Sequence, residues 1–468
     1  MTRVDRTRLP GIDRTRLPRV GTPADVTFPA FSRHTLDGGL ALRTARLEGL
    51  PLASVILVVP SGTARDPGAR EGLTSLTAGL MDEGAGDLDA IQLHEAFARL
   101  GTHVETDVGA DATMFGFTLV ERHLEAALAL LGTMLAAPRF EPGDFARERE
   151  LRLSRLLQMR EMPQAIADRA MLAAVYGAHA YGHGALGSDT SMAATTRDEV
   201  AAHHAAAFGS AGATLIVCGD VDAARVERAA ASAFAPWHRG AAPAAPVPVS
   251  GPAGAVLVLN RPGAAQTELR VARLSTTRLT PDYHALVVLN LALGGQFVSR
   301  INSKLREEKG YTYGARTGFD LRKGEGLFIC QTAVERDATA DALNDIFTEL
   351  KAAATDRPID GAELERAKTS LARGYARGLE TIDQVARQAA QMALYGLPDD
   401  HVDRFVPQVR ALTGADMQAA ASRWVWPAEY AAVAVGDADR IEPAVRALGL
   451  APVRRVEDVE ALVGPANP

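Results

Sequence analysis

One order of predicted elements occurs twice along the chain, and this repeat restricts the fold more than any other feature. An apolar strand ends in Val-Cys-Gly-Asp-Val-Asp at 217–222, and a second ends in Val-Ala-Val-Gly-Asp-Ala-Asp at 433–439. In each half a long helix is expected upstream, capped by Asp144 in the first and by an Asp360/Glu363 capping box in the second. A shared order of elements with weak identity indicates a duplicated domain.

The predicted fold class is α+β, with two homologous α/β domains that each pack helices on a mainly antiparallel sheet. The length of 468 residues agrees with two domains or more. Apolar, β-branched runs predict strands at 53–59, 112–120, 213–218, 254–259, 268–272, 326–332 and 430–435. Helical periodicity and caps predict helices at 72–81, 88–100, 121–136, 144–162, 198–208, 282–293 and 341–354, with a second long helix from 360.

Composition places the domain boundaries. Residues 1–30, in which Asp-Arg-Thr-Arg-Leu-Pro occurs at 5–10 and again at 13–18, are expected to form an extended arm. The arm is either a solvated tail or a strap laid over a partner. The first domain is expected over 31–235 and the second over 255–455, followed by a tail at 456–468. Five prolines and three glycines mark the intervening residues 236–254 as a linker.

Charge and cysteine content exclude several kinds of protein. A net charge of −7 provides no bulk attraction to nucleic acid or anionic lipid, so neither is an expected partner. No uninterrupted apolar run is long enough for a membrane span, and the N-terminus lacks a secretory signal. The expected location is cytoplasmic, or periplasmic if a signal was trimmed. Cys218 and Cys330 stand far apart in apolar runs and are predicted to be buried rather than paired.

Residues 293–315 form the most distinctive segment of the chain. A helix is expected over 298–308, ended by Lys309 and Gly310, with a strand starting near Tyr311. Arg306 then lies in the last helical turn and Tyr313 just beyond the turn, so both side chains could point into one cleft. Residue types alone also allow an arginine that merely stabilises the helix end and a tyrosine that merely packs.

This segment resembles the C-terminal half of the M16 (pitrilysin/insulinase-like, inverzincin) metallopeptidases, in which Arg-x-x-x-Gly and a following tyrosine form an arginine–tyrosine pair. The duplicated domains and the Gly-Asp strand ends fit the same family. In its catalytic members one helix carries His-x-x-Glu-His, whose histidines bind zinc while the glutamate acts as general base. A further glutamate ligand follows on a later helix.

The corresponding positions here lack every one of those groups. Ser75 and Gly79 stand where the histidines would be, Ala78 replaces the base, and Ser-Arg-Leu at 154–156 stands where the distal glutamate is expected. We therefore expect no metal in this chain. Other histidines do not form a substitute, because His179 and His183 lie in a glycine-rich stretch and the adjacent His203 and His204 face different directions, which favours a surface or boundary role for that pair.

The resemblance implies a function shared between two chains. In two-subunit members of the family one chain holds zinc and its paralogue supplies the arginine–tyrosine pair. This chain is then expected to be inactive alone, to pair with a catalytic paralogue that carries zinc, and to use Arg306 and Tyr313 as catalytic and substrate-binding groups on a peptide. Two alternatives stay open: a scaffold protein similar to respiratory-complex core subunits, and an independent enzyme with an unseen site.

Overall fold

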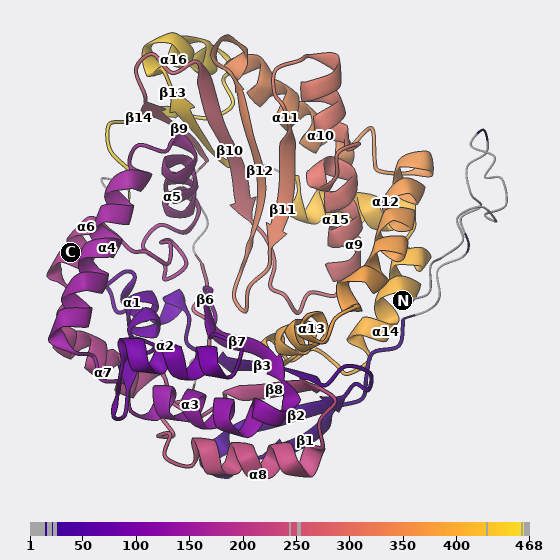
Figure 1. Ribbon diagram of the computed structural model, residues 1–468. Coiled ribbons are helices and arrows are strands. Elements are labelled where there is room, and N and C mark those ends of the chain that lie inside the picture. Colours follow the sequence, from indigo (N-terminus) through magenta and orange to yellow (C-terminus); the bar gives the residue numbers. More distant parts are fainter. Residues whose placement is uncertain are drawn as a thin grey trace.

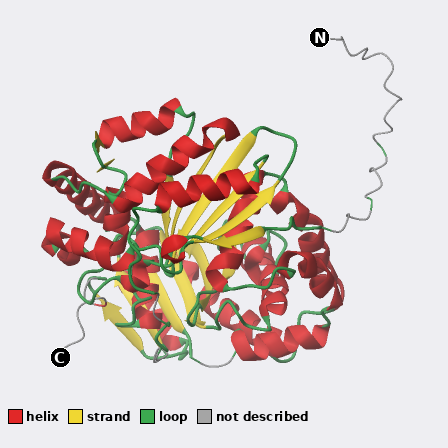
Figure 2. Cartoon of the chain, turned by 90° about the horizontal axis from the view of Figure 1, so that it is seen from below, coloured by secondary structure: helices red, strands yellow, loops and turns green. Residues whose placement is uncertain are grey.

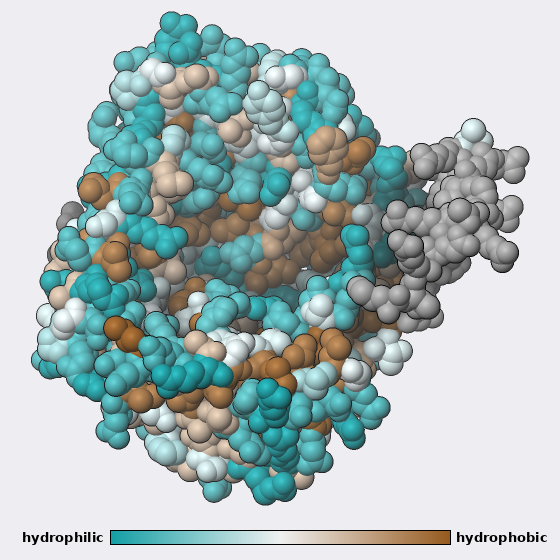
Figure 3. Space-filling view, viewed as in Figure 1, coloured by the Kyte–Doolittle hydropathy of each residue, from teal (hydrophilic) through white to brown (hydrophobic). Residues whose placement is uncertain are grey.

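The computed structural model describes residues 15, 21, 26–242, 245–249, 254–426, 429–459 and 462. The chain has a two-domain α+β fold, in which two six-stranded mixed sheets are covered by helices (Figures 1 and 2). Figure 3 shows a hollow between the two halves with apolar residues on its wall. Most of the expected arm and much of the expected tail lie outside the described residues.

The first half of the chain forms the lower sheet of Figure 1 and the helices around it. Its strands are β1 (Ser32–Thr35), β2 (Ala41–Arg46), β3 (Leu52–Val59), β4 (Gly84–Ala85), β5 (Leu88–Asp89), β6 (Glu105–Val108), β7 (Thr113–Val120) and β8 (Thr214–Gly219). Its helices are α1 (Leu73–Leu80), α2 (Ala90–Arg99), α3 (Leu124–Ala136), α4 (Pro142–Met159), α5 (Pro163–Tyr176), α6 (Asp189–Ala194), α7 (Arg197–Ala207) and α8 (Ala223–Phe234).

The second half forms the upper sheet of Figure 1. Its strands are β9 (Ala255–Asn260), β10 (Gln266–Leu274), β11 (Ala315–Asp320), β12 (Leu327–Glu335), β13 (Ala431–Gly436) and β14 (Val453–Val456). Its helices are α9 (Tyr283–Asn290), α10 (Arg300–Asn302), α11 (Thr339–Ala354), α12 (Gly361–Gly374), α13 (Ile382–Tyr395), α14 (His401–Ala411), α15 (Gly414–Trp424) and α16 (Ala438–Ala447). Two π-helical turns, η5 (Leu291–Gly295) and η6 (Ser303–Glu308), flank α10.

Five of the six strands in each sheet share one arrangement, as the repeat predicts. The sixth, an edge strand, differs: β1 precedes β2 and is antiparallel to it, whereas β14 follows β13 and is parallel to β9. The first has the order β1-β2-β8-β3-β7-β6 and the second β14-β9-β13-β10-β12-β11. The strands that end in Gly-Asp, β8 and β13, occupy the same place in each. Each is parallel to one neighbour, β2 or β9, and antiparallel to the other, β3 or β10. Most other neighbours are antiparallel, so the duplicated fold with predominantly antiparallel pairing is confirmed.

Each half lends one helix to the other half's sheet, which the sequence did not predict. From the first half, α5 buries Ala167, Met171 and Val175 against Val433 and neighbouring residues of the second sheet. From the second half, α13 covers the first sheet, where Cys218 and its neighbours meet this helix. Cys218 and Cys330 are buried and unpaired, as expected. The exchange of helices makes the two halves cover one another's apolar surface.

Both predicted caps of the long helices need correction. The helix expected to begin at Asp144 begins at Pro142, since the fixed φ of proline suits the first helical position. Asp144 instead lies inside the first turn, and the helix ends at Met159. Asp360 does precede α12, but its side chain makes no cap, and Glu363 pairs with Arg300 in place of the predicted capping box. The Glu363 side chain is held in the ion pair with Arg300 and is not available to complete a capping box.

Within the described ranges, one stretch, Tyr283–Glu308, is long and apolar enough by length and composition to cross a membrane. Half of its most apolar window is buried inside the protein. The stretch is divided among α9, the two π-helical turns and α10, and it contributes Leu286, Leu289 and Leu293 to the core of the second half. These features are those of core helices in a folded domain.

Candidate functional site

Helix α1, where the resemblance places the zinc motif of catalytic members, is held at its beginning by Asp66. Its carboxylate accepts from the backbone amides of Gly72 and Thr74 at 2.6 Å each, which satisfies two free amides of the first turn. Gly72 has a φ of 86°, and a Cβ there would come within 2.8 Å of the backbone of Leu186. Burial raises the pKa of Asp66 despite these bonds. Asp66 and the close packing at Gly72 thus hold the beginning of α1 in place, although the helix carries no zinc-binding side chain.

A guanidinium occupies the space in front of Ser75 and Gly79. Arg152 of α4 donates from Nη1 to the hydroxyl of Ser75 at 3.0 Å and from Nη2 to its carbonyl oxygen at 2.8 Å. A Cβ on Gly79 would lie only 3.1 Å from Nη2 of the same arginine. Ala78 is fully buried in the core of the first half. The two positions that would hold zinc therefore face an arginine side chain.

This set of residues does not fit a zinc ion. Zinc needs thiolate, imidazole or carboxylate ligands, whereas the groups here are a hydroxyl, a glycine and a cation. The cationic state of Arg152 would also repel a divalent ion. Burial lowers the pKa of Arg152 from its ordinary value, with Glu148 and Asp66 acting in the opposite direction. Among the described residues, no group of three or more His, Cys, Asp or Glu side chains is placed to hold a metal.

The sequence placed the distal position slightly wrongly. At 154–156, Ser154 and Arg155 are exposed and Leu156 is buried, and the side chain that reaches α1 comes from Arg152. Arg152 lies about half a helical turn before the expected stretch at 154–156. A spacing error of two residues therefore assigns the distal position to another face of α4. Arg152 is one of several charged residues along α4, so the sequence did not single it out.

Two adjacent histidines of the first half, His203 and His204, are structural. His203 forms a 2.9 Å hydrogen bond with the Thr74 hydroxyl, and His204 donates from Nε2 to the Leu135 carbonyl at 2.9 Å. Both are buried, which corrects the expected surface or boundary role, and burial lowers the pKa of each to about 4. His179 and His183 lie outside helices, as predicted.

Arg306 and Tyr313 line the same cavity, whose volume is about 780 Å³. The helix expected over 298–308 begins at Arg300 and finishes in η6, and Gly310 turns the chain with a φ of 67°. The Arg306 guanidinium donates from Nε at 3.0 Å and from Nη2 at 2.5 Å to Oε1 of Glu307 and lies 3.3 Å from the ring centre of Phe297. Tyr313 is 93% exposed.

Hydrogen bonds hold the two sides of this turn in register. Asn302 accepts from the Ala315 amide at 2.8 Å and donates to its carbonyl at 2.6 Å, which ties α10 to the start of β11. Gly294 packs so closely on β11 that a Cβ would lie 2.7 Å from the backbone nitrogen of Thr317. Positions 306 and 313 therefore stand on a fixed frame while their side chains reach the cavity.

A buried arginine that sequence reasoning missed forms another wall of this cavity. Arg270 of β10 is only 1% exposed and donates to Asp168 at 2.6 Å and to Glu268 at 2.9 Å. Asp168 belongs to α5, so this ion pair joins the exchanged helix to the second sheet. The strand also carries Glu268 and Arg273, so the sequence did not single out Arg270.

Two sequence models of one peptidase family match the chain in succession. The model described as insulinase (peptidase family M16) matches residues 45–189, and the one described as the peptidase M16 inactive domain matches residues 194–371. An uncharacterised zinc protease of Mycobacterium tuberculosis is 27% identical over 410 residues, 86% of this chain and 92% of that protein. An uncharacterised zinc protease of Mycobacterium leprae is 27% identical over 352 residues, 74% and 79% respectively.

Solved structures share the fold over most of the chain. A peptidase M16 inactive domain from Pseudomonas fluorescens has a TM-score of 0.82 and 24% identity, covering 87% of this chain and 98% of that one. A protease from Helicobacter pylori has a TM-score of 0.80 and 19% identity, covering 87% and 99%. With both halves matched by models of the same family, the chain belongs to the M16 (insulinase-like) peptidase family.

Proposed function

We propose that this chain is the zinc-free subunit of a two-chain M16 zinc peptidase and that it supplies Arg306 and Tyr313 to the partner's active site. One observation carries the proposal: the arginine and the tyrosine line a single cavity, whereas positions 75 and 79 face Arg152 and cannot hold zinc. The relatives' names as zinc proteases agree with a peptidase complex that contains the metal elsewhere.

In this proposal the two side chains act as hydrogen-bond donors to the peptide. A guanidinium and a phenol suit the substrate carbonyl and the oxyanion that develops on it when water attacks. Nη1 of Arg306 has no hydrogen-bond partner among the described residues, so this edge of the guanidinium is available while Glu307 and Phe297 hold the rest. Tyr313 is exposed enough to reach a second chain.

The test mixes this chain with a catalytic M16 paralogue that carries His-x-x-Glu-His and measures hydrolysis of an unfolded peptide. Wild type should support turnover, and Arg306→Ala or Tyr313→Phe should each lower kcat by about 10²–10³, the usual cost of losing one oxyanion donor. Lys309→Ala and Tyr311→Phe are the matched controls, because neither residue lines the cavity. Unchanged rates with both active-site variants, in complexes shown intact by size-exclusion chromatography, would refute the proposal.

The engagement of Arg306 with Glu307 and Phe297 favours a second candidate, a non-catalytic scaffold. A fold of this kind also occurs in complex III2 of Candida albicans, with a TM-score of 0.76 at 13% identity, covering 89% of this chain and 99% of that one. A scaffold would associate with its paralogue without altering turnover. Stable association with equal rates in the presence and absence of this chain would favour that function.

A further inference from the structure

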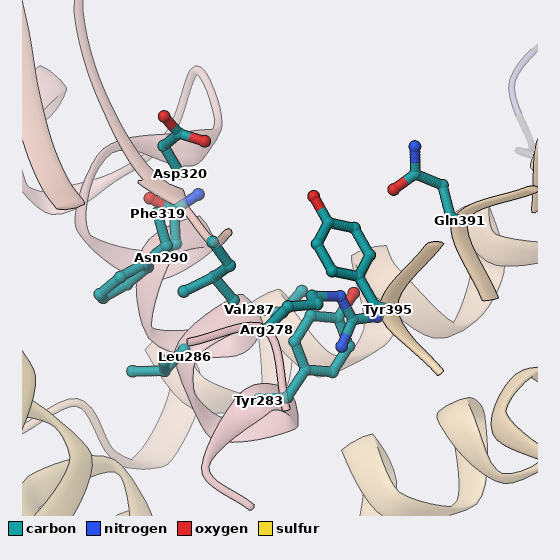
Figure 4. Close-up of a pocket in the computed structure, with 10 residues that line it drawn as sticks. Arg278, Tyr283, Leu286, Val287, Asn290, Phe319, Asp320, Gln391 and Tyr395 are labelled. Atoms are coloured by element: carbon teal, nitrogen blue, oxygen red, sulfur yellow. The ribbon is translucent and has the colours of Figure 1, made fainter. Parts of the chain in front are cut away.

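A second cavity of about 340 Å³ lies between α9, the end of β11 and α13 (Figure 4). One side carries Leu286, Val287 and Phe319 with the amide of Asn290 beside them, and Gln391 lies on the opposite side (Figure 4). Its volume falls within the range of sites that hold small ligands. The cavity has no role in the arginine–tyrosine pair, and its chemistry is set by one side chain.

Arg278 is a half-buried cation without a carboxylate partner among the described residues. Its guanidinium lies 3.6 Å from the ring centre of Tyr283 and donates from Nη2 to Nε2 of His401 at 3.0 Å. Burial lowers the pKa of His401 to about 4, so the imidazole is neutral and offers no counter-charge. Figure 4 shows the guanidinium beside Tyr283 and Tyr395, with an open space above them.

The one carboxylate on the cavity wall already has a partner. Asp320 accepts from Arg322 through Nε at 2.9 Å and Nη2 at 2.7 Å. Burial lowers the pKa of Arg278, and its tyrosine neighbours are neutral at pH 7 and supply no counter-charge. A buried charge that lacks a counter-charge is unfavourable unless a ligand supplies one. A bound anion would supply the counter-charge that Arg278 lacks.

We propose that this cavity binds a carboxylate attached to an apolar group, with the charge on Arg278 and the apolar part against Leu286 and Phe319. The hydroxyl of Tyr395 and the amide of Asn290 line opposite sides of the cavity (Figure 4), and either group can bind a second oxygen or an amide. A planar guanidinium is the side chain best suited to a carboxylate. The ligand class follows from this cavity and does not depend on the partner chain.

The position of the cavity favours the C-terminal residue of a peptide as the source of that carboxylate, an identification that rests on the proposed peptidase function. Asn290 lines both this cavity and the cavity of Arg306 and Tyr313, so the two adjoin. Strand β11 runs between them. Ala315, at its beginning, lines the cavity of Arg306 and Tyr313, and Asp320, at its end, lines the cavity of Arg278. At about 3.3 Å per residue this strand spans roughly 17 Å, the length of about five extended residues.

The experiment measures binding to the purified wild-type chain by fluorescence polarisation with a labelled hexapeptide that ends in leucine. The free acid should bind on the order of tenfold more tightly than its C-terminal amide, as expected for a charge-assisted hydrogen bond. In Arg278→Gln the ratio should fall to about one, and Arg278→Lys should restore part of it. Arg404→Gln, an exposed arginine of the adjacent helix α14, should keep the full ratio.

The outcomes separate this inference from the proposed function. Equal affinity of acid and amide for wild type would overturn it, and so would an unchanged ratio in a folded Arg278→Gln chain. Competition by N-acetyl-leucine at the same affinity as the peptide would overturn the peptide source and leave a site for small apolar acids. A preserved acid-to-amide ratio together with full turnover in Arg306→Ala would refute the proposed function alone.

Discussion

Arg152 donates two hydrogen bonds to Ser75, one to its hydroxyl and one to its carbonyl oxygen, at 3.0 and 2.8 Å. The two residues belong to helices that begin far apart in the sequence, α4 and α1. In a catalytic member of the family this space would belong to the metal, whereas here a side chain of the protein fills it. The positive charge beside Ser75 therefore comes from an arginine side chain of the chain itself.

Removal of Ser75 should destabilise the protein through this arginine. Ser75→Ala deletes the acceptor of a buried charged donor, and we expect the free energy of unfolding to fall by about 1–3 kcal/mol in urea titration. Removing both partners is much less costly than removing one, so the double variant Ser75→Ala/Arg152→Met should recover most of the loss. Ser154→Ala, at an exposed position of α4, serves as control. A loss in the double variant equal to the sum of the losses in Ser75→Ala and Arg152→Met would show that the pair is not coupled.

Zinc binding should return only when the arginine is removed. The chain as it stands should contain far less than one zinc per molecule by mass spectrometry of the purified protein. Ser75→His/Ala78→Glu/Gly79→His should still lack zinc, because a Cβ on Gly79 already approaches Arg152 and the guanidinium repels the ion. Addition of Arg152→Glu should supply the missing ligand and raise the content toward one. Stoichiometric zinc in the wild-type protein would contradict the proposed division of labour.

Stability should fall on acidification because two buried histidines resist protonation. Burial lowers the folded-state pKa of His203 and of His204 to about 4, below the ordinary value of about 6.5. Their contribution is fully present above pH 6.5 and is lost as the pH falls through 4, since the unfolded chain binds the protons first. Each accounts for at most about 2 kcal/mol between pH 7 and pH 5.

The measurement is urea unfolding at pH 7, 6 and 5. His203→Gln can still hydrogen-bond to Thr74 but cannot titrate, so its stability should depend less steeply on pH than that of wild type. His103→Gln is the control, because that side chain is 83% exposed. Identical slopes in wild type and His203→Gln would show that this histidine contributes nothing to the acid sensitivity.

The glycine beside β11 should not tolerate a methyl group. Gly294→Ala would place its Cβ 2.7 Å from the backbone nitrogen of Thr317, which cannot move without disturbing the strand. We expect a loss of about 1–3 kcal/mol, typical of overpacking. Gly314→Ala, in the same cavity wall, meets nothing closer than 3.7 Å and should change stability little. Similar melting temperatures for the two variants would contradict this close packing.

The repeat can be read from the sequence because apolar strands leave local patterns. The runs that end in Gly219 and Gly436 predict the two equivalent strands, and the orders of the sheets match apart from the edge strands β1 and β14. The exchange of α5 and α13 was not readable. An amphipathic helix specifies an apolar face but not which of two similar sheets covers it, and this choice depends on the path of the whole chain.

The sequence by itself determined the duplicated α+β fold, the family and the absence of zinc-binding side chains at positions 75 and 79, because these depend on local pattern and residue type. Only the tertiary structure decided that Arg152 fills the vacated space and that Arg278 lines a cavity without a counter-charge. Both facts depend on which faces of distant helices and strands meet. That geometry is set by the packing of the assembled core, and no short stretch of the chain contains it.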